Sequence, residues 1–63
     1  MNNKELGAIC RAYRESLGLL QSDVAKDVNY SKENVSAFEN GRNNNARILQ
    51  WYLEHGLIIK DGR

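Results

Sequence analysis

Few side chains in this sequence are able to do covalent or metal chemistry. Cys10 is the only cysteine and His55 the only histidine among the 63 residues, which rules out an internal disulfide and argues against structural zinc. Cys10 shares a helical stripe with Leu6 and Tyr13, so we expect a small core residue rather than a nucleophile. Neither Cys10 nor His55 has a second ligand or a base partner. We therefore expect no enzyme, no metal, no cofactor and no small-molecule substrate.

A second group of polar residues lies mid-chain, where Ser31 is followed by Lys32, Glu33 and Asn34. Serine is a good helix N-cap, because its hydroxyl accepts from backbone N–H groups of the first turn. Asn29, just before, tolerates positive φ better than other residues that carry a Cβ. The three side chains after Ser31 would then stand on the first turn of a short helix. There they either contact a partner or are solvated, with Glu33 placed only for the helix dipole.

Hydrophobic periodicity predicts the four helices that would position these residues. Apolar side chains recur at three- and four-residue steps from Asn3 to Leu17, and Gly18 suits the end of that helix. Further helices are expected over Gln21 to Val28, Lys32 to Asn40 and Ala46 to His55. The remaining tail, residues 57–63, is short and β-prone. Residues 1–63 are therefore expected to form one all-α, four-helix domain with an extended C-terminal tail.

Length and charge set limits on the partners of such a domain. A chain this short buries only about 60% of the surface that its unfolded form exposes, so a partner subunit would stabilise it. The net charge of +1 neither indicates nor excludes a nucleic-acid partner, since local placement of charge matters more than the total. The opening MNNKELG is polar, and the apolar run from Leu57 to Ile59 is too short to span a bilayer. We expect a cytoplasmic protein without a signal peptide or membrane contact.

Two short helices joined by a tight turn form a helix-turn-helix, whose second helix enters the DNA major groove. The chain resembles the Cro/repressor-type helix-turn-helix family of phage and bacterial transcription regulators, with the motif at about 21–40. The matching residues are Leu6, Gly7, Arg14, Gly18, Leu19, Gln21, Val24, Ala25, Ser31, Val35 and the run FENGR from Phe38 to Arg42. Leu20 departs from the family pattern, which has a capping Ser or Thr there, so the second helix is expected to start irregularly.

The resemblance implies a role for each polar residue near this motif. Base reading is implied for Lys32, Glu33, Asn34, Ser36 and Ala37. Contacts to DNA phosphates are expected from Gln21, Ser31, Asn40, Arg42, Asn43, Asn44 and Arg47, although a solvated turn would use the same asparagines. Arg11 and Lys26 are expected to add long-range attraction. Arg14 and Glu39 are instead implied to form a buried ion pair between the first and third helices.

Trp51 is the residue that suggests a dimer. On a helical wheel it falls far from the face formed by Ile48, Leu49, Tyr52 and Leu53, so we expect it outside their core. Such an aromatic, followed by Leu57, Ile58 and Ile59, favours a surface buried against a second subunit. The alternative is that the tail folds back over Trp51 within one chain. A two-fold dimer would present two reading helices about 34 Å apart, which implies a palindromic operator.

The resemblance leaves two functions open. The first is a small phage Cro-like repressor that binds a double-stranded DNA operator as a homodimer in a bacterial host, where it would be nucleoid-associated. The second is a protein-interaction module of the same fold, an antirepressor or antitoxin that modulates a partner repressor or toxin. The low net charge and Glu33 favour the second function, since phosphates repel an acidic group in the groove.

Overall fold

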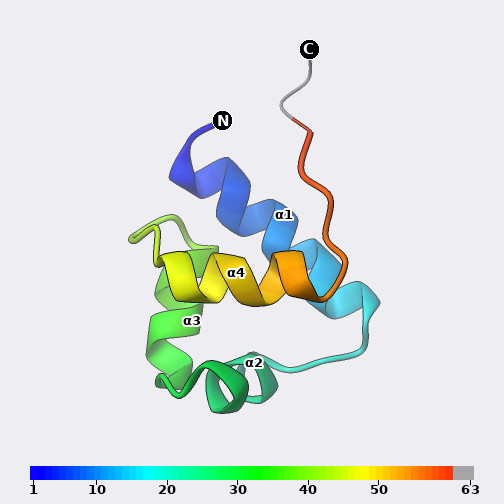
Figure 1. Ribbon diagram of the computed structural model, residues 1–63. Helices are drawn as coiled ribbons and strands as arrows, with labels where there is room; N and C mark the ends of the chain where they lie inside the picture. The colour runs from blue at the N-terminus through cyan, green and yellow to red at the C-terminus, as the bar shows by residue number, and fades with distance from the viewer. Residues whose placement is uncertain (61–63) are drawn as a thin grey trace.

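Helices are the only regular structure in residues 1–60, the part of the chain that this computed structural model describes (Figure 1). They are α1 (Asn3–Ser16), α2 (Gln21–Val28), α3 (Lys32–Glu39) and α4 (Ala46–Glu54). The predicted all-α class is confirmed, and α1, α3 and α4 each end one residue earlier than the periodicity predicts. Among residues 1–60, no helix is long and apolar enough to cross a membrane.

Side chains next to the helices satisfy their first N–H groups. The Asn2 side chain accepts from the Glu5 N–H at 2.8 Å, and the Glu5 carboxylate accepts from the Asn2 N–H at 3.2 Å, which is a capping box. Leu20 has no side-chain acceptor to cap α2, but the Asp23 carboxylate accepts from the Leu20 N–H at 2.8 Å. This reverse half of a capping box is present although Leu20 lacks a capping oxygen, and α2 begins at Gln21 as predicted.

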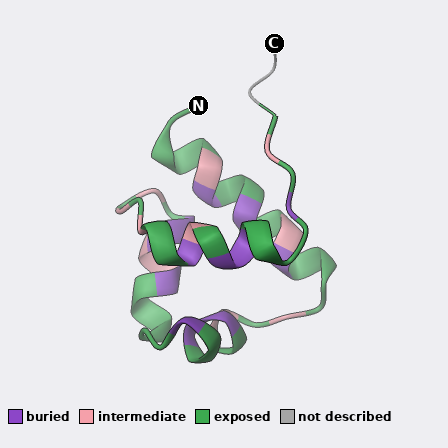
Figure 2. Cartoon of the chain, viewed as in Figure 1, coloured by how far each residue is buried: buried purple, intermediate pink, exposed green. Residues whose placement is uncertain are grey.

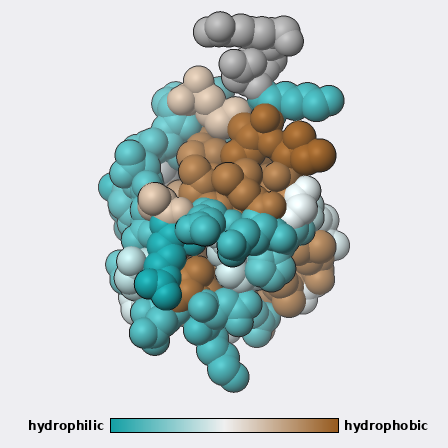
Figure 3. Space-filling model, in the orientation of Figure 1, coloured by the Kyte–Doolittle hydropathy of each residue, from teal (hydrophilic) through white to brown (hydrophobic). Residues whose placement is uncertain are grey.

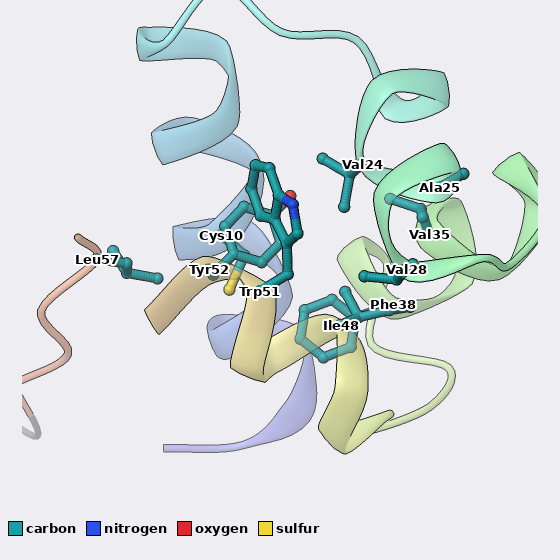
Figure 4. Packing of buried hydrophobic residues seen from close by; sticks show 10 residues of the cluster. All are labelled: Cys10, Val24, Ala25, Val28, Val35, Phe38, Ile48, Trp51, Tyr52 and Leu57. Atoms are coloured by element: carbon teal, nitrogen blue, oxygen red, sulfur yellow. The ribbon is translucent and has the colours of Figure 1, made fainter. Parts of the chain in front are cut away.

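The core lies where all four helices face inward (Figures 2 and 4). Val24, Val35, Ile48 and Tyr52 are fully buried near its centre, each with no accessible surface. The complete buried apolar cluster consists of Cys10, Val24, Ala25, Val28, Val35, Phe38, Ile48, Trp51, Tyr52 and Leu57. Burial of Cys10 agrees with its expected role as a small core residue, and burial, with a smaller effect of the Glu39 charge, raises the pKa of its thiol to about 11.

The prediction that Trp51 lies outside the core is wrong. Its side chain is only 5% exposed, and its ring packs edge-on against Tyr52 with the centroids 5.0 Å apart. The indole N–H donates to the Asp27 carboxylate on α2 at 2.9 Å. In an ideal helix Trp51 lies about 60° from Ile48, whereas Leu53 lies about 140° away. The core face is therefore centred on Ile48, and Leu53, predicted to be inward, is 48% exposed.

The burial of two residues predicted to be inward in the first helix, and of the tail, also differs from the prediction. Ile9 and Leu17 belong to the predicted apolar stripe but are 36% and 44% exposed. Leu57, predicted to face another subunit, is instead only 9% exposed and joins the core of its own chain. Residues 57–60 form no strand despite their β-prone sequence, and the rest of the predicted tail, 61–63, lies outside the described residues.

Candidate nucleic-acid interface

The first turn of α3 presents three polar side chains outward. Ser31 caps the helix, since its hydroxyl accepts from the Asn34 N–H at 3.2 Å. The preceding turn is closed by Asn29, which takes the left-handed conformation at φ 61° and ψ 40°. Lys32, Glu33 and Asn34 then follow in sequence, and all three are exposed. Local capping and one left-handed residue thus place an acid, a base and an amide at the start of a helix.

The second turn of α3 is more buried than the first. Ser36 and Ala37 are half-buried, while Val35 before them and Phe38 after them point into the core. Asn40, just after the helix, donates from its side chain to the Ser36 carbonyl at 2.8 Å and more weakly to the Ser36 hydroxyl at 3.4 Å. Asn40 therefore closes the C-terminus of α3, and its Nδ2 is occupied within the chain.

A buried carboxylate seats α3 against the other three helices. Glu39, only 4% exposed, accepts from Arg14 Nε at 2.8 Å and from Arg14 Nη2 at 3.1 Å. Its two oxygens also accept from the Tyr52 hydroxyl at 2.9 Å and from the Gln21 side-chain amide at 3.0 Å. These contacts come from α1, α2 and α4, so the ion pair that the resemblance implies is part of a larger network. Within residues 1–60, no buried side-chain polar atom lacks a partner.

The pKa values of this network follow from burial and charge. Burial alone would raise the pKa of Glu39, but hydrogen bonds from Arg14, Gln21 and Tyr52, with the Arg14 charge, outweigh it and hold the pKa below its ordinary 4.5. Burial, followed by the charge of Glu39, raises the pKa of Tyr52. Tyr52 therefore stays a hydrogen-bond donor and Glu39 stays an acceptor, which fixes the orientation of α3.

A glycine lets α1 and α3 approach closely. A Cβ on Gly7 would lie 2.5 Å from the Glu39 carbonyl oxygen, a separation that real Cβ atoms do not show. Any larger residue at this position would push the C-terminal turn of α3 away from α1. Gly7 and the buried Glu39 network thus act on the same end of α3, opposite the end that carries the exposed first turn.

A depression in the surface lies at the start of α2. It has a volume of about 330 Å³ and is lined by Arg11, Arg14, Leu20, Gln21, Ser22 and Lys32. Gln21, predicted to bind phosphate, uses one amide N–H on Glu39 and is half-buried. Sequence reasoning gave Arg11 only a long-range role and did not single out Ser22. A helical step from Arg11 to Arg14 was the available signal for Arg11, whereas only the packing of α3 against α1 and α2 brings Lys32 to the same depression.

The loop between α3 and α4 is held by its own asparagines. Asn43 accepts from the Asn45 N–H at 3.1 Å, and Asn45 caps α4 by accepting from the N–H groups of Arg47 and Ile48 at 2.9 and 3.2 Å. Asn43 thus has a structural contact within the turn, while Arg42 and Asn44 are exposed. The Arg47 guanidinium lies 5.9 Å from the ring centroid of Tyr30, a contact between α4 and the helix-turn-helix turn that the sequence did not suggest.

Apolar surface remains on the molecule although Trp51 and Leu57 are buried. Ile9, Leu53 and Ile58 are 36%, 48% and 78% exposed, and we call these three residues the apolar patch. Figure 3 shows apolar surface gathered in the upper part of the face in view, where Figure 1 places α1 and the tail, above α4. Three side chains exposed to this extent leave on the order of 300 Å² of apolar surface in total.

Comparison with known proteins gives one family. A family model described as "Helix-turn-helix domain" matches residues 5–48, which includes α1, α2, α3 and the first turn of α4. The match therefore contains Arg14, Gln21 and Glu39 of the buried network, the exposed first turn of α3 and the depression beside α2, whereas Tyr52 lies beyond it. No curated protein and no solved structure matches the sequence.

Proposed function

The chain belongs to the helix-turn-helix domain family, and from this premise we propose that it is a sequence-specific DNA-binding transcription regulator. The proposal is a Cro-like repressor that occupies a palindromic operator as a homodimer in the bacterial cytoplasm. The observation that carries it is the first turn of α3, where exposed polar side chains stand on a helix that a buried four-helix network holds in place. A rigid helix with a polar leading edge suits the major groove.

The proposed base contacts follow from the donors and acceptors on α3. The Glu33 carboxylate accepts from cytosine N4, and the Asn34 amide pairs with adenine through N6 and N7. Ser36 pairs with either kind of edge, while the Ala37 methyl packs on a thymine methyl. Ser36 and Ala37 are half-buried, so they contact the bases only where the helix lies deep in the groove. Glu33 is repelled by the phosphates and therefore favours sites that offer it a donor.

The proposed contacts to DNA phosphates fix the position of the protein along the duplex. On the far side of α3 we propose Arg42 and Asn44, which are exposed, and Arg47, whose guanidinium lies near Tyr30. Asn43 and Ser31 contribute backbone N–H groups and their remaining side-chain capacity, because each side chain already has a hydrogen bond within the chain. Asn40 contributes only the side-chain hydrogen that it donates weakly to the Ser36 hydroxyl at 3.4 Å, since its backbone N–H already donates to the Ser36 carbonyl at 3.0 Å. These contacts position the protein and carry no sequence information.

The homodimer is proposed to form through the apolar patch together with Ile59. A two-fold axis at this surface pairs apolar side chains with the same side chains of the second copy. The area is smaller than the roughly 800 Å² per partner of a stable interface, so the dimer is weak in solution and is completed on DNA. Ile58→Lys should abolish cooperative binding to two half-sites while leaving the melting temperature unchanged, since Ile58 is 78% exposed. Unchanged cooperativity would remove the patch from the dimer.

The experiment that tests the proposed function is selection of bound duplexes from a random pool. Enrichment of an inverted repeat with half-sites one helical turn apart supports operator binding by a dimer. Asn34→Ala should then relax the preference at one base pair and cost about 1 to 3 kcal/mol on the selected site, with little change on random DNA. Glu33→Gln, which keeps the size of the side chain and changes the acceptor proposed to face cytosine, should relax the preference at a different base pair.

A protein-interaction module is the second candidate. The observation that favours it is the exposed Glu33 in the reading turn of a chain whose net charge is only +1. A repressor or toxin partner would then take the same surface that DNA takes in the first proposal. Selection without any enriched sequence, combined with the absence of salt-dependent binding to random duplexes, would favour this candidate over the operator binder.

A further inference from the structure

The depression between α1, α2 and the start of α3 has the charge of an anion site. Three cationic residues line it, and one of them, Arg14, is neutralised by the buried Glu39 at 2.8 Å. Arg11 and Lys32 therefore supply the net charge, and none of the six lining residues is acidic. Arg42 and Asn44, the loop residues proposed above to contact phosphates, do not line the depression.

Among residues 1–60, the ion pair that competes for Arg11 is a weak one. Arg11 Nε lies 3.5 Å from the Glu15 carboxylate one turn along α1, and the two side chains are 58% and 56% exposed. Exposed pairs at this spacing on a helix contribute only a few tenths of a kcal/mol. An anion of higher charge density in the depression would therefore recruit the Arg11 guanidinium from Glu15 at little cost.

Hydrogen-bond donors in the depression match the oxygens of a phosphate. The Gln21 side-chain nitrogen carries two hydrogens, of which one is donated to Glu39 at 3.0 Å. The Ser22 hydroxyl is exposed, and both residues begin α2, where backbone N–H groups have no partner within the helix. A guanidinium, an ammonium, an amide and a hydroxyl thus surround one open space, and charge-assisted hydrogen bonds from such groups are short and strong.

The position of Lys32 points to the DNA backbone as the source of that phosphate. Lys32 is the first residue of α3 and also lines the depression with Gln21 and Ser22. When α3 occupies the major groove, which is about 12 Å wide, the phosphates that border the groove pass beside the first turn of the helix. The depression therefore lies at the rim of the groove rather than over the base edges.

We propose that Arg11, Lys32 and Ser22, with the side-chain amide of Gln21, hold one phosphodiester group of the DNA backbone. Lys32 then positions the protein and does not read a base, in contrast to the role that the resemblance implies. Arg11 makes direct contact with the phosphate instead of acting only at long range. This inference rests on the proposed function for its ligand, but the anion site itself stands on the geometry of the depression.

The first test compares salt dependence on random-sequence duplexes. Arg11→Ala with Lys32→Ala should lower the slope of log affinity against log salt by about 0.9, the value for one phosphate contact. Over a rise from about 50 to about 200 mM salt, the wild type should then lose about 3.5-fold more affinity than the double variant. The control is a chain that loses the same two charges at exposed positions outside the depression, Lys26→Ala with Lys60→Ala. An equal change of slope in this control would refute a localised contact.

The second test separates backbone contact from base reading. Lys32→Ala should weaken binding to a selected duplex and to a scrambled duplex by the same factor. Loss confined to the selected duplex would make Lys32 a base reader and overturn the proposal. Circular dichroism melting of each variant verifies folding, which is expected to be unaffected because Arg11, Lys26, Lys32 and Lys60 are all exposed.

The third test needs no DNA and distinguishes the anion site from the function on which it rests. Titration of the full chain with inorganic phosphate should shift the backbone amide resonances of Gln21 and Ser22 in a saturable way, and the shift should diminish in Arg11→Ala. Saturable shifts without any DNA binding would keep the anion site, reject the DNA backbone as its ligand and reject the proposed function. Absence of the shifts together with an unchanged salt slope would overturn the inference, even if the chain binds DNA.

Discussion

Replacement of Glu39 by alanine should cost this domain most of its stability. The carboxylate accepts four hydrogen bonds, two of them from Arg14, and Arg14 is itself only 6% exposed. The variant would leave a buried guanidinium without its counter-ion, a change that costs about 3 to 5 kcal/mol. A domain of this length has a total stability of about 3 to 9 kcal/mol. We therefore expect the melting temperature to fall by at least about 12 °C.

The matched control is Glu15→Ala, which removes the same residue type from an exposed ion pair with Arg11. Its side chain is 56% exposed, so its pair is screened by solvent and should contribute at most about 0.5 kcal/mol. Both variants are measured by urea unfolding followed at the helical circular dichroism band, with the slope of each transition compared to verify two-state behaviour. Equal losses in the two variants would refute the reasoning that the Glu39 network holds α3 in place.

The same network predicts a pH dependence. The folded-state pKa of Glu39 lies below 4.5, which is close to the value expected in the unfolded chain. Its contribution is therefore fully present above about pH 4.5 and is lost as the pH falls through the lowered folded-state pKa. Glu39→Gln, which cannot titrate, should lose less stability than the wild type between pH 5 and about pH 2. Parallel curves for the two proteins would show that Glu39 titrates as an ordinary surface carboxylate.

Three further changes test the packing. Gly7→Ala should destabilise the fold by about 1 to 3 kcal/mol in urea unfolding, because its methyl would meet the Glu39 carbonyl. Trp51→Ala should lower the free energy of unfolding by about 3 to 5 kcal/mol, whereas Leu53→Ala, at an exposed position, should lower it by under about 1 kcal/mol. Similar losses for the two variants would show that Trp51 is not a core residue. Cys10, fully buried with its pKa raised to about 11, should react with a thiol reagent at pH 7 only as fast as the chain unfolds. Rapid labelling of the native protein would contradict this.

Much of the fold was predictable because its signals are local. Ser31 caps α3, Asn29 takes the left-handed turn and Asn45 caps α4, and each of these contacts spans only a few residues. The ion pair between Arg14 and Glu39 joins residues 25 positions apart and came from the resemblance, since spacing alone cannot show that two charges meet.

The packing of α4 was the main error, and its cause is physical. Periodicity shows which residues share a helix face, but the width and centre of the buried arc depend on how the neighbouring helices cross. Trp51 is buried because α2 offers the Asp27 carboxylate to its indole N–H, and Leu57 is buried because the chain turns back after His55. Leu53, which the same periodicity placed inward, lies on the exposed side of α4, where 48% of the residue remains accessible to solvent.

The amino-acid sequence by itself determined the four helices, their caps and turns, and the polar residues that begin α3, because these depend on neighbours within a few positions. The tertiary structure was needed to show that Arg11 and Lys32 line one depression, that Gln21 joins the Glu39 network, and that Ile9, Leu53 and Ile58 are exposed. Those outcomes depend on the angles and distances at which helices cross, and close packing of the whole core sets these at once.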